Sequence, residues 1–200
     1  MSEVDDAAAA ILAGRPAIVP TDTVYGLVTS PYREEPVRGL YALKGRPPTQ
    51  PTALIAADLA TLFDCLPELR GRAGAIASAV LPGPYTLVLP NPARRFPWLA
   101  GDNPDAIGVR VPSVSGVAKT LLGLVGAVAG TSANLAGGRD ARSLAEVPEA
   151  LLAGAAALDG GELPGIPSTV IDFTGPVPVV LRRAAGDVDD AIARALAAVG

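Results

Sequence analysis

Two cations separated by a single glycine, Lys44 and Arg46, form the pattern in this chain that best suits anion binding. Two prolines, Pro47 and Pro48, follow at once and constrain the backbone. Cations that serve only solubility would be better placed on a solvated helix face, whereas two cations on a constrained loop can converge on a phosphate or a carboxylate. The pattern therefore predicts an anion-binding loop.

A second polar stretch, Gly130 to Arg139, follows an apolar run and combines small residues with hydroxyl and amide side chains. Small residues let backbone amides approach a ligand closely, and Thr131, Ser132 and Asn134 offer groups for phosphate or sugar oxygens. The stretch has neither the Gly-Lys-Ser/Thr ending of the P-loop nor the GxGxxG spacing of dinucleotide-binding loops. An ordinary turn between a strand and a loop is the alternative.

A third candidate is the octet from Pro20 to Leu27, which follows an apolar run at 17–19. Proline can end a strand ladder, and Thr21, Asp22 and Thr23 then place three short polar side chains where the backbone leaves the sheet. A small-molecule site can begin in this way. For the octet alone, however, the favoured interpretation is a turn whose Asp and Thr side chains bond their own backbone.

Two further positions carry polar side chains at predicted strands. Arg110 lies in the alternating run 107–112, so it is either on a solvated face or in a cleft, and the sequence does not choose between these. Ser168 and Thr169 stand at the head of an apolar run that ends at Asp172. The last predicted strand ends in Arg182 and the cation that follows it.

Composition excludes several classes of function. The chain has no histidine, which removes Ser-His and Cys-His nucleophiles and histidine-ligated metals, and its one cysteine, Cys65, is predicted to be a structural thiol. A net charge of −4 argues against binding nucleic acid by bulk charge, although a local basic cleft fits the sequence. The longest apolar stretch, 121–130, is too short for a bilayer, so we expect a cytoplasmic protein without a membrane segment.

The elements that must position these groups alternate irregularly between helices and strands. Apolar runs predict strands at 17–19, 51–56, 86–90, 107–112, 126–129, 168–172 and 177–183. Capping and periodicity predict helices at 4–13, 35–43, after Asp58, at 67–80, 115–124 and 143–152, and after Asp187. We expect one α/β domain over residues 1–200, built on a twisted, open mixed sheet flanked by helices.

One long segment without a predicted element interrupts this pattern. Residues 91–104 contain several prolines and the only tryptophan, Trp98. A segment of this length is either a surface excursion that serves as a lid or a packed loop, and the packed loop is favoured.

Taken together, these stretches resemble the YrdC-like threonylcarbamoyl-adenylate synthase family in its short form. The resemblance covers roughly residues 7–186, and the order and spacing of its motifs are more specific than any one of them. The matching motifs are the octet at 20–27, Lys44-Gly45-Arg46-Pro47, Thr86-Leu87-Val88-Leu89, Gly108-Val109-Arg110-Val111-Pro112, Ser132-Ala133-Asn134, Ser168-Thr169-Val170-Ile171-Asp172 and Leu181-Arg182.

The resemblance implies a fold with a large concave cavity and a reaction that combines L-threonine, bicarbonate and ATP into threonylcarbamoyl-AMP and pyrophosphate. ATP is then a substrate, and Mg²⁺ is expected with it, held mainly by phosphate oxygens and water. The product would serve tRNA modification through partner proteins, with weak or indirect contact to tRNA itself. As implied site residues, the resemblance gives Lys44, Arg46, Ser132 and Asn134 as a catalytic tetrad around the nucleotide, Arg182 as a further nucleotide contact, and Thr23, Arg110 and Thr169 as threonine contacts.

The chain also departs from the family pattern, at Thr52, Val114 and the pair Ala184-Ala185. These departures keep two alternatives open: adenylate chemistry with a carbamoyl donor such as carbamoyl phosphate, or a non-catalytic paralogue that binds nucleotide or RNA. Replacing Lys44 or Arg46 by alanine should weaken nucleotide use and leave the fold intact, because exposed loop cations contribute little to stability.

Overall fold

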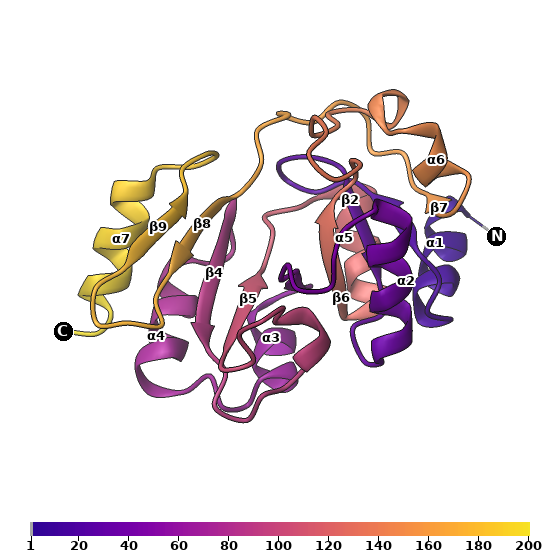
Figure 1. The fold of residues 1–200 in the computed structure, drawn as a ribbon. Coiled ribbons are helices and arrows are strands. Elements are labelled where there is room, and N and C mark those ends of the chain that lie inside the picture. The colour runs from indigo at the N-terminus through magenta and orange to yellow at the C-terminus, as the bar shows by residue number, and fades with distance from the viewer. Residues whose placement is uncertain (1) are drawn as a thin grey trace.

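Nine strands form one open mixed sheet in residues 2–200, the part of the chain that the computed structural model describes. The strand order is β7-β1-β2-β6-β3-β5-β4-β8-β9 (Figure 1). The strands are β1 (Ala17–Val19), β2 (Gly26–Thr29), β3 (Ala53–Ala56), β4 (Tyr85–Pro90), β5 (Ala106–Arg110), β6 (Ala127–Ser132), β7 (Ala156–Ala157), β8 (Thr169–Asp172) and β9 (Val179–Arg182). The predicted mixed α/β sheet is confirmed, and the limit of 1–200 for a single domain stays a prediction.

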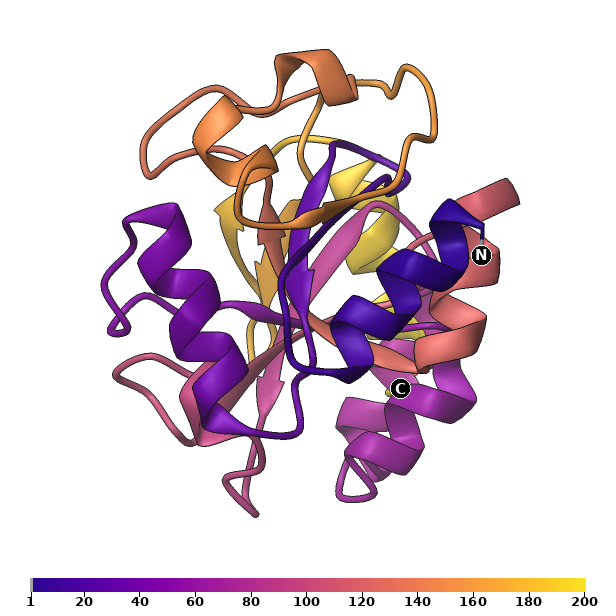
Figure 2. The same ribbon diagram turned by 90° about the vertical axis from the view of Figure 1, so that its right-hand side faces the viewer.

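Helices pack at both ends of this sheet (Figures 1 and 2). They are α1 (Glu3–Leu12), α2 (Glu34–Lys44), α3 (Leu59–Cys65), α4 (Gly71–Val80), α5 (Gly116–Val125), α6 (Glu149–Leu152) and α7 (Val188–Ala197). Helices α4 and α7 contact each other beside β8 and β9, whereas α1 and α5 contact each other beside β1 and β2. None of the helices in residues 2–200 is long and apolar enough to cross a membrane.

The helix caps follow the sequence signals. Ser2 and Asp5 form a capping box at the start of α1, and the Asp58 carboxylate accepts the amide of Thr61 at the start of α3. Asp187 caps α7 in the same way. The helices bury their apolar faces against the sheet in two core clusters, the larger of which contains Tyr25, Leu54, Leu87 and Phe173. The smaller cluster, with α1 and α5, lies on the concave face of the sheet and the larger cluster lies on the opposite face, so the middle of the concave face is left free for a site.

The register of the central strands places small residues in one row across the concave face. Gly108 of β5 lies opposite Ala53 of β3 and Val88 of β4, and Ala53 lies opposite Gly130 of β6. A Cβ atom at Gly130 would approach Ile55 Cδ1 to 2.5 Å, so the Ile55 side chain would have to shift to admit a larger residue there. Because side chains are short along this row, the middle of the concave face is open.

Several predicted boundaries were wrong. The octet was read as a turn, but its last two residues, Gly26 and Leu27, already belong to β2, which pairs with β6. That pairing also extends β6 through Ser132, beyond the predicted end at 129. Strands β2 and β7 were missed because four and two residues give no alternation to detect, and all four positions of β2 are buried.

The predicted helix at 143–152 is also wrong. The chain instead forms a 3₁₀ turn, η2 (Leu144–Glu146), and the one-turn helix α6. Pro148 explains the break, because proline lacks an amide hydrogen and disfavours helical backbone at the residue before it. Helix α4 begins at Gly71, four residues after its predicted start at Pro67.

Residues 91–104 form a packed loop, as favoured over the lid. Asn91 is buried, and its amide nitrogen donates to the carbonyl oxygens of Arg95 and Pro104. The indole nitrogen of Trp98, in the 3₁₀ turn η1 (Pro97–Leu99), donates to Pro31 at 2.8 Å. The loop is therefore tied to the body of the protein at its base and at its tip.

Candidate functional site

A cavity of about 420 Å³ opens on the concave face of the sheet. Its walls combine the row of small residues with three arginines, Arg46, Arg110 and Arg182. Strands from both halves of the sheet contribute, so the cavity spans the molecule between β6 on one side and β8 and β9 on the other (Figure 1). The predicted site residues lie in the wall of this cavity or directly behind it.

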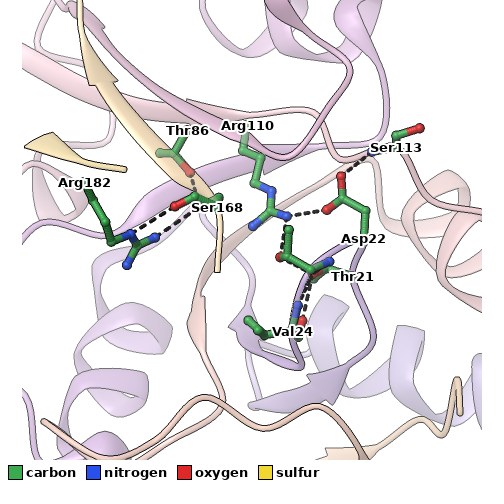
Figure 3. Close-up of polar contacts among 9 residues, drawn as sticks. Thr21, Asp22, Val24, Thr86, Arg110, Ser113, Ser168 and Arg182 are labelled. Carbon is green, nitrogen blue, oxygen red and sulfur yellow. Dashed lines mark hydrogen bonds and ion pairs between the residues drawn. The ribbon is translucent and has the colours of Figure 1, made fainter. Parts of the chain in front are cut away.

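Arg110, the last residue of β5, lies in a cleft and not on a solvated face. Its guanidinium donates to the carboxylate of Asp22 and to the hydroxyl of Thr23, the latter at 2.8 Å. The second carboxylate oxygen of Asp22 accepts the amide of Ser113 at 2.8 Å (Figure 3). Asp22 therefore does more than hold its own turn, because it joins the 20–25 loop to the end of β5.

The side chains of Arg110 and its partner Asp22 are both buried. Its side chain is 8% exposed and that of Asp22 is 9% exposed, so water screens this ion pair weakly. Burial lowers the pKa of Arg110, and the negative charge of Asp22 opposes this shift. The Nε atom of Arg110 is buried and has no hydrogen-bond partner among the described residues. The guanidinium of Arg110 therefore keeps hydrogen-bonding capacity that its protein partners do not use.

The 20–25 loop is folded by the side chain of Thr21. The Thr21 hydroxyl donates to the carbonyl oxygen of Val24 at 2.7 Å and accepts the amides of Thr23 and Val24, as the turn interpretation predicts (Figure 3). Thr23 is buried between Thr21 and Arg110. From this loop, Thr21 and Val24 contribute to the cavity wall. The predicted threonine contact Thr23 lies behind them.

Lys44 also lies behind the wall. It is the last residue of α2 and is 4% exposed, so its description as an exposed loop cation was wrong. Its ammonium donates to the carbonyl oxygens of Ser132 and Asn134 and to the side-chain oxygen of Asn134. The Ser132 hydroxyl donates to the same side-chain oxygen at 2.8 Å. Lys44 therefore fixes the backbone on which Ser132 faces the cavity.

Arg46 reaches the cavity because the chain turns sharply after Lys44. Gly45 ends α2 with φ of 68°, a left-handed conformation that glycine adopts without strain. The guanidinium of Arg46 then donates to the hydroxyl of Thr131 at 2.9 Å and to the carbonyl oxygen of Pro51. The two cations of the Lys-Gly-Arg motif thus face different ways, one into the protein and one into the cavity.

Arg182 closes the opposite wall together with two hydroxyls. Its Nε donates to the carbonyl oxygen of Ser168 at 2.9 Å, and a terminal nitrogen donates to the Ser168 hydroxyl at 3.2 Å. That hydroxyl lies 2.9 Å from the hydroxyl of Thr86 (Figure 3). Thr169, the predicted contact, is fully buried and accepts the amide of Ala184.

Of the eight predicted site residues, four line the cavity and four support it. Arg46, Arg110, Ser132 and Arg182 line it, whereas Lys44, Asn134, Thr23 and Thr169 lie behind the wall. The sequence analysis missed Thr86 and Ser168 as wall residues. Strand alternation carried a signal for Thr86, because its side chain lies on the same face as that of Val88, and Ser168 directly precedes the residue that was chosen.

Among residues 2–200, no group of three or more His, Cys, Asp or Glu side chains could hold a metal ion. One carboxylate, Asp172, lines the cavity, and its Oδ1 accepts the amide of Thr174 at 2.8 Å. Hard cations such as Mg²⁺ can bind through a single carboxylate when phosphates and water complete the coordination. The site therefore fits a cation that arrives with a phosphate ligand and offers no protein cage.

Comparison with known proteins places this geometry in a family. A family model named Sua5_yciO_yrdC, described as "Telomere recombination", matches residues 9–184. A "Threonylcarbamoyl-AMP synthase" of Halorhodospira halophila is 37% identical over 180 residues, which cover 90% of this chain and 94% of that protein. A protein of the same name from Methylococcus capsulatus is 40% identical over 138 residues, covering 68% and 73%.

Solved structures agree with the sequence relatives. Pyrococcus abyssi Sua5 complexed with L-threonine superposes with a TM-score of 0.84 and 32% identity, covering 95% of this chain and 57% of that one. Escherichia coli YciO superposes with a TM-score of 0.81 and 27% identity, covering 94% of this chain and 91% of that one. The chain thus matches over half of the longer protein and nearly all of the shorter one.

Proposed function

This chain belongs to the Sua5/YciO/YrdC family, and we propose that it is a threonylcarbamoyl-AMP synthase that uses L-threonine, bicarbonate and ATP. The observation that carries the proposal is the 37% identity to a synthase of that name over 90% of the chain. The arginine-lined cavity supports it, because all three substrates bring negatively charged groups. Binding of threonine is supported by the L-threonine complex of P. abyssi Sua5, a structural relative.

The reaction needs positioning and charge stabilisation more than a covalent nucleophile. Threonine's amine and bicarbonate give a carbamate and a molecule of water, and one carbamate oxygen then attacks the α-phosphorus of ATP as pyrophosphate leaves. Negative charge accumulates on the phosphoryl and pyrophosphate oxygens, where fixed cations and hydrogen-bond donors stabilise it. A chain without histidine can supply all of these groups.

We assign different residues of the cavity wall to different substrates. Arg46, Ser132 and Arg182 would bind the triphosphate, since they line the cavity and can donate to phosphate oxygens. Arg110 lines the cavity and would hold the carboxylate of threonine, which places the carbamate close to the phosphorus. Lys44, Asn134, Thr23 and Thr169 would then act as positioning residues.

Mg²⁺ is proposed to enter with ATP. Phosphate oxygens and water would hold it, with Asp172 as the carboxylate that the cavity offers. When bound, the ion would neutralise charge on the leaving pyrophosphate. The product is proposed to be used in the cytoplasm by partner proteins that modify tRNA, with weak or indirect contact between this chain and tRNA.

The departures at Thr52 and Val114 do not favour the alternative functions. The Thr52 hydroxyl donates to the carbonyl oxygen of Gly130 at 2.7 Å, so its polar group is satisfied within the sheet. Val114 packs against the smaller core cluster. Neither residue changes the arginines or hydroxyls that line the cavity.

The decisive experiment is a coproduct assay with each substrate omitted in turn. We expect pyrophosphate release only when ATP, threonine and bicarbonate are all present. The Arg46→Met variant should lose most of this activity, whereas Arg38→Met, on the exposed side of α2, serves as the matched control. Release that does not need threonine, or AMP formation with carbamoyl phosphate in its place, would contradict the proposal.

The synthase activity should also fall as the pH rises through about 8. Burial lowers the pKa of Lys44 to about 8, and the charge of Arg46 adds to this shift. Three acceptor oxygens face this group, and only the ammonium form has three N–H donors, so deprotonation loosens the Ser132–Asn134 backbone.

This loss of activity should not be caused by unfolding. The ordinary lysine value is 10.5, so between about pH 8 and 10.5 the unfolded chain holds the Lys44 proton more tightly than the folded chain. The contribution of Lys44 to the free energy of unfolding therefore rises with pH in this window. A pH profile of kcat/KM with a melting temperature at each pH tests both statements, and an activity loss that tracks melting would contradict them.

A further inference from the structure

The three arginines that line the cavity differ in how their charge is compensated. Arg110 forms a buried ion pair with Asp22. In contrast, among residues 2–200 no carboxylate oxygen lies within 4.0 Å of Arg46 or Arg182, whose guanidiniums donate only to hydroxyl and carbonyl oxygens. The cavity therefore has two uncompensated cations and one neutral ion pair.

Asp22 acts on the cavity only through Arg110. Its two oxygens are engaged by the Arg110 guanidinium and the Ser113 amide, and its side chain is not part of the cavity wall. A ligand in the cavity therefore meets the donors of Arg110 while the negative charge of Asp22 stands directly behind them (Figure 3). Because both side chains are buried, this charge is weakly screened.

Without Asp22, Arg110 would join the other cations in one anion site. The positive charge of Arg182 acts on Arg110 and contributes to its lowered pKa, so the two guanidiniums are electrostatically close. A polyanion could then bridge both, because a triphosphate carries several charges over a length that reaches more than one cation. Such bridging would block the place where threonine must bind.

We propose that Asp22 is a specificity-determining residue that neutralises Arg110 and so keeps polyphosphate out of the threonine subsite. The inference rests on the proposed function and deepens it. A neutral ion pair still offers hydrogen-bond donors to the single carboxylate of a zwitterionic amino acid, which brings its own ammonium. A triphosphate at the same place gains little from a compensated cation and is repelled by the carboxylate behind it. Threonine and the triphosphate can therefore occupy the cavity together.

The test measures binding without turnover and uses inorganic triphosphate as the polyanion. Threonine is titrated into the unmodified protein by calorimetry, with and without saturating triphosphate. We expect the threonine Kd to change by less than about threefold, since the two ligands are assigned to different residues of the cavity wall. Competitive displacement of threonine by triphosphate in the unmodified protein would overturn the proposal.

The Asp22→Asn variant should convert independent binding into competition. At a triphosphate concentration that leaves the unmodified protein unaffected, we expect the apparent threonine Kd of this variant to rise about tenfold or more. Glu34→Gln is the matched control, because it removes one negative charge from an exposed pair with Arg38. Independent binding in a folded Asp22→Asn protein would overturn the proposal. A purely structural role of Asp22 would lower the melting temperature without creating competition.

Asp22→Glu keeps the inference testable if the asparagine variant does not fold. It retains the negative charge, so threonine and triphosphate should still bind independently, and competition in this variant would count against the charge argument. The outcomes also separate the two proposals. Absence of threonine binding to the unmodified protein would contradict the proposed function, whereas threonine binding that triphosphate displaces would contradict only the role of Asp22.

Discussion

Replacing Arg110 with lysine is expected to raise the KM for threonine by about 10- to 100-fold and to change the KM for ATP by less than about threefold. Lysine keeps a positive charge beside Asp22, so the buried carboxylate is not left alone and the fold should persist. What is lost is the rigid guanidinium, one terminal nitrogen of which bonds both Asp22 and Thr23 while the residue lines the cavity. A hydrogen bond to a charged group contributes about 1.5–3 kcal/mol, which sets the size of the effect.

Steady-state kinetics with each substrate varied in turn measures this effect. Arg182→Lys is the matched comparison, because Arg182 lies on the opposite wall and is assigned to the triphosphate. It should raise the KM for ATP and leave that for threonine nearly unchanged. If both variants raised both constants equally, the assignment of Arg110 to threonine and of Arg182 to the triphosphate would be wrong.

Replacing Lys44 with methionine is expected to remove activity and to destabilise the protein by about 2–4 kcal/mol. The substitution leaves the oxygens of Ser132 and Asn134 without their buried donor, and unpaired buried acceptors cost about 1–3 kcal/mol each. For a chain of 200 residues this predicts a drop in melting temperature of roughly 5–15 °C. Activity should fall even below the melting transition, because Ser132 loses its fixed position.

Lys119→Met is the control for this variant. Lys119 is the only other lysine and is exposed on α5, so its replacement should shift the melting temperature by less than about 2 °C. Calorimetry and the coproduct assay are run on both variants. A fully stable Lys44→Met protein with reduced nucleotide use would contradict this prediction. It would instead support the prediction from the sequence that Lys44 is an exposed loop cation.

The sequence predicted the chemistry of the site better than its geometry. The types and spacing of Lys44, Arg46 and Ser132 correctly mark the segments that meet at the cavity. Burial is not encoded in those spacings, however, so nothing in the sequence distinguished the cation that faces the cavity from the one that supports the wall. The positive φ of Gly45, which separates them, follows from the helix ending at Lys44.

The fold was predictable where an element carries its own local signal. Strand β4 alternates along its length and α1 has a capping box, so both were found. Strand β2 has no such signal, because it is short, buried throughout and defined by its pairing with β6. The role of Asp22 was underestimated for a related reason: both of its partners lie about 90 residues away in the sequence.

The hydrogen bonds that hold the cavity wall together affect the order in which the protein folds. Contacts between Asp22 and Arg110, Lys44 and Asn134, and Thr86 and Ser168 join positions 88, 90 and 82 residues apart. Loops of this length close late in folding, since their entropy is recovered only when the intervening strands have paired. In a chain emerging from the ribosome the wall is therefore completed late, because Arg182 must be synthesised and β9 must join β8.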